Sequence, residues 1–219
     1  WYDITLCGQP MRFPVTTNTH IISLDDALSE EQFLTRLLDS LQPNDVVYDI
    51  GANLGVVSIL LARQSAATEV RIEAFEPIPD NIAMLRDNLG RHEADQVIVH
   101  PLALGATAGR VTLDIEGNQF EVPVSPGQDI ASASGHPPTV LKIDVEGAEL
   151  DVLRGVSDLL DQPTVRELFI ELHPGFMAQR GDSQQSLDTF LTQRGYRLVW
   201  SKQRNLETHL HYRAAEVQP

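Results

Sequence analysis

The sequence is poor in cysteine, in lysine and in long apolar runs. Its 219 residues include a single cysteine, Cys7, so no disulfide can form within the chain, and a reducing, cytoplasmic location is expected. No apolar run approaches the roughly 20 residues that a membrane-spanning helix needs, and no basic-then-apolar leader opens the chain. These absences predict a water-soluble protein without a membrane span.

Basic residues are scarce as well. Only Lys142 and Lys202 are lysines, and 16 lysines and arginines oppose 31 acidic residues, which gives a formal net charge of −15. A surface of this charge repels nucleic acid, so neither DNA nor RNA is expected as a partner. A generally acidic soluble protein and an adaptation to high salt are both compatible with this composition. Nothing in it indicates an oligomeric state.

The length suits one globular domain with an N-terminal extension. We expect residues 1–43 to form an N-terminal arm and a helix, and residues 44–219 to form the main domain. Within the first segment, residues 1–28 are mixed in character and indicate a short arm or hairpin. Ser29 and Gln32 form a plausible capping box, and the apolar residues that follow at helical spacing predict a single helix here.

From residue 44 onward, short apolar runs alternate with segments of helical periodicity. Apolar runs with little polar alternation are typical of strands covered on both faces. Strands that alternate with helices predict an α/β fold, with a mostly parallel sheet and helices on both faces. The predicted strands are residues 46–50, 70–75, 97–100, 140–144 and 165–171, and the predicted helices are residues 56–63, 80–89, 148–160 and 184–194.

Two stretches break this alternation and predict antiparallel hairpins. Residues 109–115 and 119–124 flank a turn sequence at 116–118, and they replace the helix expected after the third strand. Residues 196–200 and 206–212 predict a second hairpin at the C-terminal end. An antiparallel hairpin that closes an otherwise parallel sheet distinguishes the common methyltransferase fold from the dehydrogenase fold.

A glycine-rich turn follows the first strand of the main domain. Asp49 lies near the end of that strand, and Gly51, Asn53 and Gly55 follow, where glycine lets backbone N–H groups approach a nucleotide closely. A phosphate-binding loop would need Gly-Lys-Ser/Thr, but two valines follow Gly55. The carboxylate of Asp49 would repel a pyrophosphate, whereas it suits the cationic methionine portion of S-adenosylmethionine, directly or through water. Asn53 either bonds the cofactor or caps the next helix.

A second acid follows on the next strand. Glu76 ends that strand about 20 residues after Gly55, the spacing at which an acid reaches the ribose hydroxyls of an adenosine cofactor. The alternative is that Glu76 caps the helix that begins near Pro77 and Pro79. Combined with the glycine turn, Glu76 favours a nucleoside cofactor.

The motifs resemble those of the FkbM-type methyltransferases over about residues 44–200. The matching segments are 49–55, then 75–77 with Asn81 and Leu85, then 103–105, then the run Leu-Lys-Ile-Asp-Val-Glu-Gly-Ala-Glu at 141–149. The resemblance implies a seven-stranded class I methyltransferase (Rossmann-like) fold, S-adenosylmethionine as cofactor, and O-methylation of a hydroxyl on a sugar, a glycan or a polyketide-type molecule. It also implies that Ala103 and Leu104 lie near the adenine. The predicted cofactor-binding residues are Asp49, Gly51, Asn53, Gly55, Glu76, Pro77, Ala103, Leu104 and Asp144.

Candidate catalytic residues follow the fourth and fifth strands. Asp144 and Glu171 end these strands and His173 comes two residues later, so a parallel sheet places all three on the cofactor's edge. Methyl transfer to a hydroxyl requires the protein to hold the oxygen near the methyl group and to take its proton. The ordinary pKa of histidine makes His173 a candidate base, and Asp144 is the alternative. Lys142 is expected to pair with a carboxylate in the strand. We therefore predict Asp144, His173, Glu171 and Lys142 as the catalytic residues.

Simpler explanations exist for several of these residues. Acids at a helix start are favoured by the helix dipole alone, so Glu149 is interpreted as structural, and Glu146 stays open. His173 precedes Pro174 and is also compatible with a loop residue.

Other chemistries stay open as alternatives. Asp144, Glu171 and His173 could gather a divalent metal, but no spacing demands one, and none is predicted. Two other functions are compatible with the sequence. One is a nicotinamide-dependent oxidoreductase, which the glycine pattern disfavours, and the other is a non-catalytic nucleoside-binding module.

Overall fold

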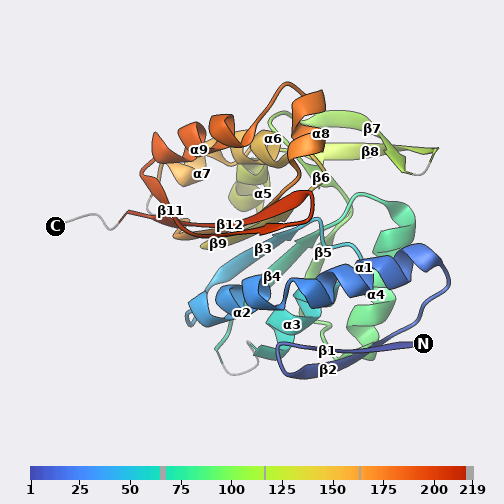
Figure 1. Ribbon diagram of the computed structural model, residues 1–219. Helices are drawn as coiled ribbons and strands as arrows, with labels where there is room; N and C mark the ends of the chain where they lie inside the picture. Colours follow the sequence, from blue (N-terminus) through green and yellow to red (C-terminus); the bar gives the residue numbers. More distant parts are fainter. Residues whose placement is uncertain (65–67, 116, 163, 216–219) are drawn as a thin grey trace.

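A seven-stranded sheet forms the centre of the computed structural model, which describes residues 1–64, 68–115, 117–162 and 164–215 (Figure 1). In sheet order the strands are β11 (Tyr196–Arg204), β12 (Glu207–Ala214), β10 (Glu167–Leu172), β9 (Val140–Asp144), β3 (Val46–Ile50), β4 (Arg71–Phe75) and β5 (Ile98–His100). The five strands from β10 to β5 pair in parallel, and β12 pairs antiparallel with both β10 and β11. This confirms the class I methyltransferase fold expected from the sequence, with its antiparallel C-terminal hairpin.

Helices cover both faces of this sheet, as predicted. All six residues of β10 are buried, because a strand between two helical layers exposes neither face. Figure 1 shows α1 to α4 on one side of the sheet and α5 to α9 on the other. Their bounds are α1 (Asn18–Ser29), α2 (Glu31–Ser40), α3 (Val56–Gln64), α4 (Pro79–Arg91), α5 (Gly127–Ser134), α6 (Glu149–Arg154), α7 (Ser157–Leu160), α8 (Pro174–Gln179) and α9 (Gln184–Thr192). None of the helices in the described parts of the chain is long and apolar enough to cross a membrane.

The N-terminal segment contains one helix more than predicted. The expected hairpin forms as β1 (Tyr2–Leu6) and β2 (Gln9–Phe13), but α1 follows it, with Thr17 as its N-cap. The predicted capping box was wrong, because Ser29 ends α1 and its hydroxyl donates to the Asp26 carbonyl at 2.7 Å. Glu30 sits between α1 and α2 instead. All four elements pack in one core with α3 and α4.

The first predicted hairpin is confirmed as β7 (Gly109–Ile115) and β8 (Asn118–Ser125), although turn residue 116 lies outside the described residues. The two strands form a separate three-stranded sheet with β6 (Ala103–Leu104). The expectation that this hairpin replaces a helix was wrong. Helix α5 follows β8 and leads back to β9, so the hairpin is an insertion before the helix.

The long helix predicted at 148–160 is interrupted at Gly155. The chain forms α6 and α7, which are separated at Gly155. A Cβ atom on Gly155 would lie 2.0 Å from the carbonyl oxygen of Gly105, so the chain at this point passes directly against the loop after β6. Helix α8 was not predicted either. It begins at Pro174, whose fixed φ suits the first helical position, directly after His173.

Candidate active site

The glycine turn after β3 packs against the ends of both neighbouring strands. The N–H groups of Gly51 and Ala52 donate to the Phe75 carbonyl at 2.9 and 3.0 Å. Gly51 has a φ of +85°, and a Cβ atom there would lie 1.8 Å from the Asp144 carbonyl oxygen. Gly55, with a φ of +87°, similarly contacts Leu85 of α4. Only glycine combines this φ with these approaches.

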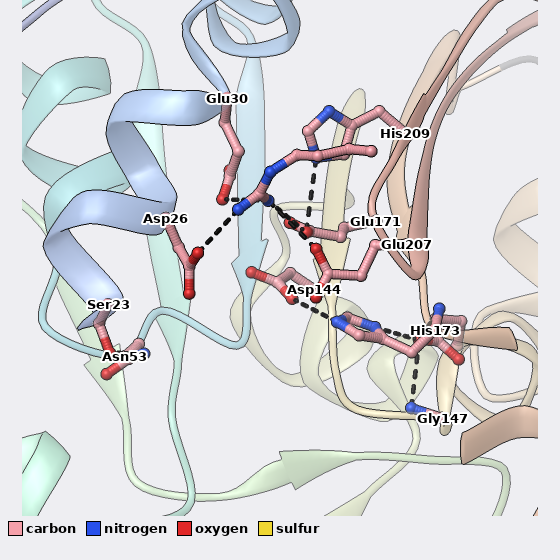
Figure 2. A network of polar contacts seen from close by, with 12 residues as sticks. Ser23, Asp26, Glu30, Asn53, Asp144, Gly147, Glu171, His173, Glu207 and His209 are labelled. Carbon is pink, nitrogen blue, oxygen red and sulfur yellow. Dashed lines mark hydrogen bonds and ion pairs between the residues drawn. The ribbon is translucent and has the colours of Figure 1, made fainter. Parts of the chain in front are cut away.

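A cavity of about 50 Å³ lies between this turn, the end of β9 and helix α1. The predicted residues Gly51, Asn53, Lys142 and Asp144 all line it. The residues from the N-terminal segment were not predicted. Figure 2 shows Ser23 of α1 beside Asn53, whose amide donates to the Ser23 hydroxyl at 3.4 Å. The N-terminal lining residues are Ser23, Ala27 and Glu30.

Glu76 links the glycine turn to the start of α4. Its Oε2 accepts from the Asn53 N–H at 2.9 Å, and its Oε1 accepts from the Ile78 N–H at 2.9 Å and from Asn81 Nδ2 at 3.4 Å. Burial raises the pKa of Glu76, and the two backbone hydrogen bonds oppose that rise. Glu76 thus lies on the predicted edge, with the half-buried Pro77 beside it. Its contact with a ribose stays a prediction.

Asp49 and Lys142 form a buried charged pair behind the cavity. Asp49 is fully buried, and its Oδ2 accepts from the Ser58 hydroxyl at 2.6 Å. Its Oδ1 lies 3.7 Å from Lys142 Nζ and has no hydrogen-bond partner among the described residues. Lys142 Nζ donates to Asp144 Oδ2 at 3.0 Å. The predicted pairing of Lys142 with a carboxylate is present. Asp49, by contrast, does not line the cavity.

Burial and charge act in opposite directions on Lys142. Burial lowers its pKa, but the charges of four nearby acids raise it by more than burial lowers it, so its pKa lies above the ordinary value. The four acids are Asp144, Asp49, Glu30 and Glu171. Lys142 therefore stays cationic and cannot act as a base. Burial is also the main cause of the raised pKa of Asp49.

His173 lies between two carboxylates, one of which, Asp144, lines the cavity. Its Nδ1 lies 2.8 Å from Oε1 of Glu149, the first residue of α6, and its Nε2 lies 3.9 Å from Asp144 Oδ1 (Figure 2). Burial lowers the pKa of His173, but the hydrogen bond to Glu149 and the charges of Asp144, Glu149 and Glu171 raise it to about 9. The sheet thus brings Asp144 and His173 together, as the sequence predicted.

Glu171 is held by cationic and imidazole groups from the C-terminal hairpin. Its Oε1 lies 3.0 Å from a guanidinium nitrogen of Arg204 and 3.5 Å from His209 Nε2. Burial raises the pKa of Glu171, but His209 and Lys142 lower it by more than burial raises it, and the resulting pKa is about 2. Glu171 therefore stays ionised and is a poor proton acceptor. Its contribution to the site is its negative charge.

Arg204 joins the hairpin to the N-terminal segment, which the sequence did not reveal. It pairs with Asp26 at 2.8 Å, Glu207 at 3.2 Å and Glu30 at 3.6 Å, in addition to Glu171. The burial of Glu30 and its proximity to Glu171 and Asp144 raise the pKa of Glu30 to about 9. The alternation of polar residues at 207, 209 and 211 is a signal that these side chains share one face of β12. No sequence signal marks Glu30.

The remaining predicted cofactor residues belong to the small sheet. Leu104 is buried in the core beside α5 to α9, while Ala103 is half-buried and pairs with Val124 of β8. Both follow the carboxyl end of β5, the strand next to β4. Their contact with adenine stays a prediction.

Ligand-type atoms of Glu30, Glu171 and His209 lie within 4.8 Å of one another, as do those of Glu171, His173 and Glu207. The guanidinium of Arg204 already supplies positive charge to the acids of both groups. The expectation that no metal is needed stays a prediction, to be tested by chelation.

Comparison with known proteins identifies the family. The model of the methyltransferase FkbM domain matches residues 49–198. The hexuronic acid methyltransferase AglP of Haloferax volcanii is 28% identical over 181 residues, which cover 77% of this chain and 72% of AglP. The 31-O-demethyl-FK506 methyltransferase FkbM of Streptomyces tacrolimicus is 30% identical over 177 residues, with coverage of 61% of this chain and 67% of the relative.

Solved structures show the same fold. A crystal structure of the methyltransferase FkbM from Methylobacillus flagellatus matches with a TM-score of 0.63 and 21% identity. The match covers 78% of this chain but only 44% of that one, so the chain spans less than half of this solved relative. The magnesium protoporphyrin IX methyltransferase of Synechocystis, solved with bound S-adenosylmethionine, matches with a TM-score of 0.56 and 14% identity, covering 92% of this chain and 86% of that one. The chain therefore belongs to the FkbM family of methyltransferases, with S-adenosylmethionine as its cofactor.

Proposed function

We propose that this protein methylates a hydroxyl group on a sugar, a glycan or a polyketide-type molecule. The observation that carries the proposal is the meeting of Asp144 and His173 beside the glycine turn, at the edge where class I methyltransferases bind their cofactor. The names of the two curated relatives support its parts: the 31-O-demethyl-FK506 methyltransferase supports an oxygen as the acceptor atom, and the hexuronic acid methyltransferase supports a sugar-type molecule.

The residues at the edge fit S-adenosylmethionine in chemistry. When bound, it supplies a methyl group on a positively charged sulfur, and Asp144 lines the cavity with a carboxylate that suits this charge. The cavity of about 50 Å³ is much smaller than the several hundred Å³ of typical ligand pockets. It would therefore hold only one end of the cofactor. The rest would extend along the open edge toward Glu76, or α1 would move away.

His173 is the better base of the two candidates. Asp144 Oδ2 accepts a hydrogen bond from Lys142, which weakens it as a proton acceptor, whereas the distance from His173 Nε2 to Asp144 is too long for a hydrogen bond. In the proposed step, the acceptor oxygen bonds to the methyl carbon while the carbon–sulfur bond breaks and its electrons stay on sulfur. The hydroxyl proton passes to His173 Nε2. The Asp144 carboxylate, 3.9 Å from Nε2, stabilises the positive charge that His173 then carries.

The exposed carboxylates near Asp144 and His173 favour an uncharged acceptor. The side chains of Asp26, Asp144 and Glu207 are 58%, 30% and 31% exposed, whereas those of their partners Arg204 and Lys142 are 10% and 2% exposed. An incoming molecule therefore meets carboxylates first. These accept hydrogen bonds from hydroxyl groups and repel a carboxylate. This supports a neutral hydroxyl rather than an acid group as the methyl acceptor.

The function is tested by cofactor binding and by transfer of a labelled methyl group. Calorimetry should show binding of S-adenosylmethionine and of its demethylated product, each with a rise in melting temperature, and no binding of reduced nicotinamide by fluorescence. Labelled methyl should then pass to a panel of neutral sugars and hydroxylated macrocycles in preference to uronic acids, with equal rates in EDTA. Absence of cofactor binding would refute the proposal, and loss of transfer in EDTA would establish a metal requirement.

Glu76→Ala is expected to weaken cofactor binding about 10- to 100-fold, or roughly 1–3 kcal/mol, because it leaves ribose hydroxyls and the Asn53 N–H unpaired. Calorimetry measures the dissociation constant. Glu73→Ala is the matched control, since Glu73 is a buried acid on the same strand that pairs with Arg71 and His100. It should lower stability and leave cofactor affinity nearly unchanged. Equal affinities for the two variants would mean that Glu76 is a helix cap alone.

A further inference from the structure

Glu149 is buried in an unusual way for an acid at a helix start. Its side chain has no exposed surface, although acids that merely favour the helix dipole stay largely in solvent. Its Oε1 accepts three hydrogen bonds, from the N–H of Gly147 at 3.1 Å, from the N–H of His173 at 3.2 Å and from His173 Nδ1 at 2.8 Å. Two of the three donors thus belong to one residue on another loop.

The backbone holds the two loops in contact. Gly147 has a φ of +85°, and a Cβ atom there would lie 2.6 Å from Phe176 Cβ and 2.7 Å from its carbonyl carbon. The loop after β9 therefore packs directly on the first turn of α8, which His173 precedes. This contact fixes the separation between Glu149 and the imidazole.

The hydrogen bond decides which imidazole nitrogen carries the proton. Oε1 of Glu149 already accepts from two backbone N–H groups, so it meets Nδ1 as an acceptor, and Nδ1 is the protonated nitrogen. Nε2 then carries the lone pair in the neutral ring, and it is the nitrogen that lies toward Asp144. The same arrangement, a buried carboxylate on Nδ1 and a reactive Nε2, orients the histidine of serine hydrolases.

We infer that Glu149 is a positioning residue, which fixes the ring of His173 and directs the free Nε2 to the methyl acceptor. This inference rests on the proposed role of His173 as the base. Nothing in the local sequence distinguishes this role from helix capping. The exposed Glu146, on the same loop, lacks the burial that the role requires.

The charges around His173 have a further consequence for its pKa. Glu149 of α6, Asp144 of β9, Glu171 of β10 and Glu207 of β12 face the imidazole, and Arg204 of β11 lies behind the last two. His173 is therefore protonated at neutral pH in the protein without ligand. A positive sulfonium bound near the imidazole would lower this pKa by charge repulsion.

The test is an NMR titration of the histidine side chains between pH 6 and 10.5, with His173→Asn to assign the signals. In the wild-type protein, neutral His173 should carry its proton on Nδ1. Glu149→Gln retains an accepting oxygen but loses the charge, so it should keep this tautomer and lower the pKa of His173 by about 1–2 units. Glu149→Ala should lose the tautomer preference and lower the pKa of His173, although Asp144 and Glu171 still raise it. Glu146→Gln, the matched control, should change neither.

Activity distinguishes this inference from the proposed function. With an acceptor from the methyl-transfer panel, Glu149→Gln should lower kcat about tenfold or more, shift the pH–rate profile, and leave KM for the cofactor within twofold. Unchanged titration of His173 in both Glu149 variants would overturn the inference while wild-type transfer still supported the function. Conversely, a wild-type protein that binds no cofactor would refute the function, and the titration would still report whether Glu149 holds the ring.

Discussion

Lys142→Met is expected to destabilise the protein by about 3–5 kcal/mol, because it removes one partner of a buried ion pair and leaves the other charged. Lys142 lies between Asp49 and Asp144, with Nζ to carboxylate distances of 3.7 and 3.0 Å. Methionine has a similar length but no charge. Without the ammonium group, the fully buried Asp49 must take up a proton or remain ionised with only the Ser58 hydroxyl as a partner.

The loss should grow with pH, and its sign follows from the pKa of Asp49. Burial already raises that pKa, and removal of Lys142 removes the main opposing charge. The native state then binds a proton that the unfolded state releases above about pH 4, so the free energy of unfolding falls as pH rises. Urea unfolding at pH 5.5 and pH 8 should show the larger deficit at pH 8.

The chain supplies a matched control, since its second lysine is exposed on β11. Lys202→Met should change stability by no more than about 0.5 kcal/mol. Adding Asp49→Asn to Lys142→Met should restore part of the lost stability, because the unpaired carboxylate is gone. A deficit that neither varies with pH nor responds to Asp49→Asn would mean that the effect of Lys142 is packing alone.

The strands of the sheet could be predicted because their physical signal is local. Runs such as 46–50 and 140–144 are mostly apolar, with Asp49, Lys142 and Asp144 as the exceptions, and such runs are typical of strands between two helical layers. The parallel order then brought Lys142, Asp144, Glu171 and His173 to one edge without further information. Segments whose structure depends on distant partners were less predictable. Helix α1 buries only Leu24 and Ala27, and its apolar pattern is correspondingly weak.

The site residues that the sequence missed depend on tertiary packing. Arg204 ends β11 at the tip of the C-terminal hairpin, and it pairs with Asp26 of α1 and with Glu30, which follows α1. Figure 2 shows Asp26 and Glu30 beside Glu171 and Glu207. Glu149 had a sufficient local explanation in the helix dipole, so no pattern required a partner. Its contact with His173 depends on how the loops after β9 and β10 pack at Gly147. Motifs thus locate the cofactor edge, while packing between loops determines the geometry around the base.

Gly51→Ala is the second change with a large expected effect, and it separates two costs that glycine avoids. An alanine must adopt a φ of +85°, which costs about 1–2 kcal/mol, and its Cβ must also displace the Asp144 carbonyl oxygen, which would lie 1.8 Å away. Because the carbonyl oxygen is a backbone atom, the turn and the end of β9 must move apart, which costs about 1–3 kcal/mol more. The free energy of unfolding should fall by about 2–5 kcal/mol, summing these terms.

Gly181→Ala measures the first cost alone. Gly181 has a φ of +78°, and no atom lies within 4 Å of the position that a Cβ atom would take there, so its substitution should cost only about 1–2 kcal/mol. It lies outside the cavity lining and should leave cofactor affinity unchanged. Gly51→Ala should instead weaken cofactor binding more than tenfold by calorimetry, because the turn that lines the cavity is displaced. Equal stability losses in the two variants would show that the approach of Gly51 to β9 relaxes at no cost, and the turn would then owe its glycine to φ alone.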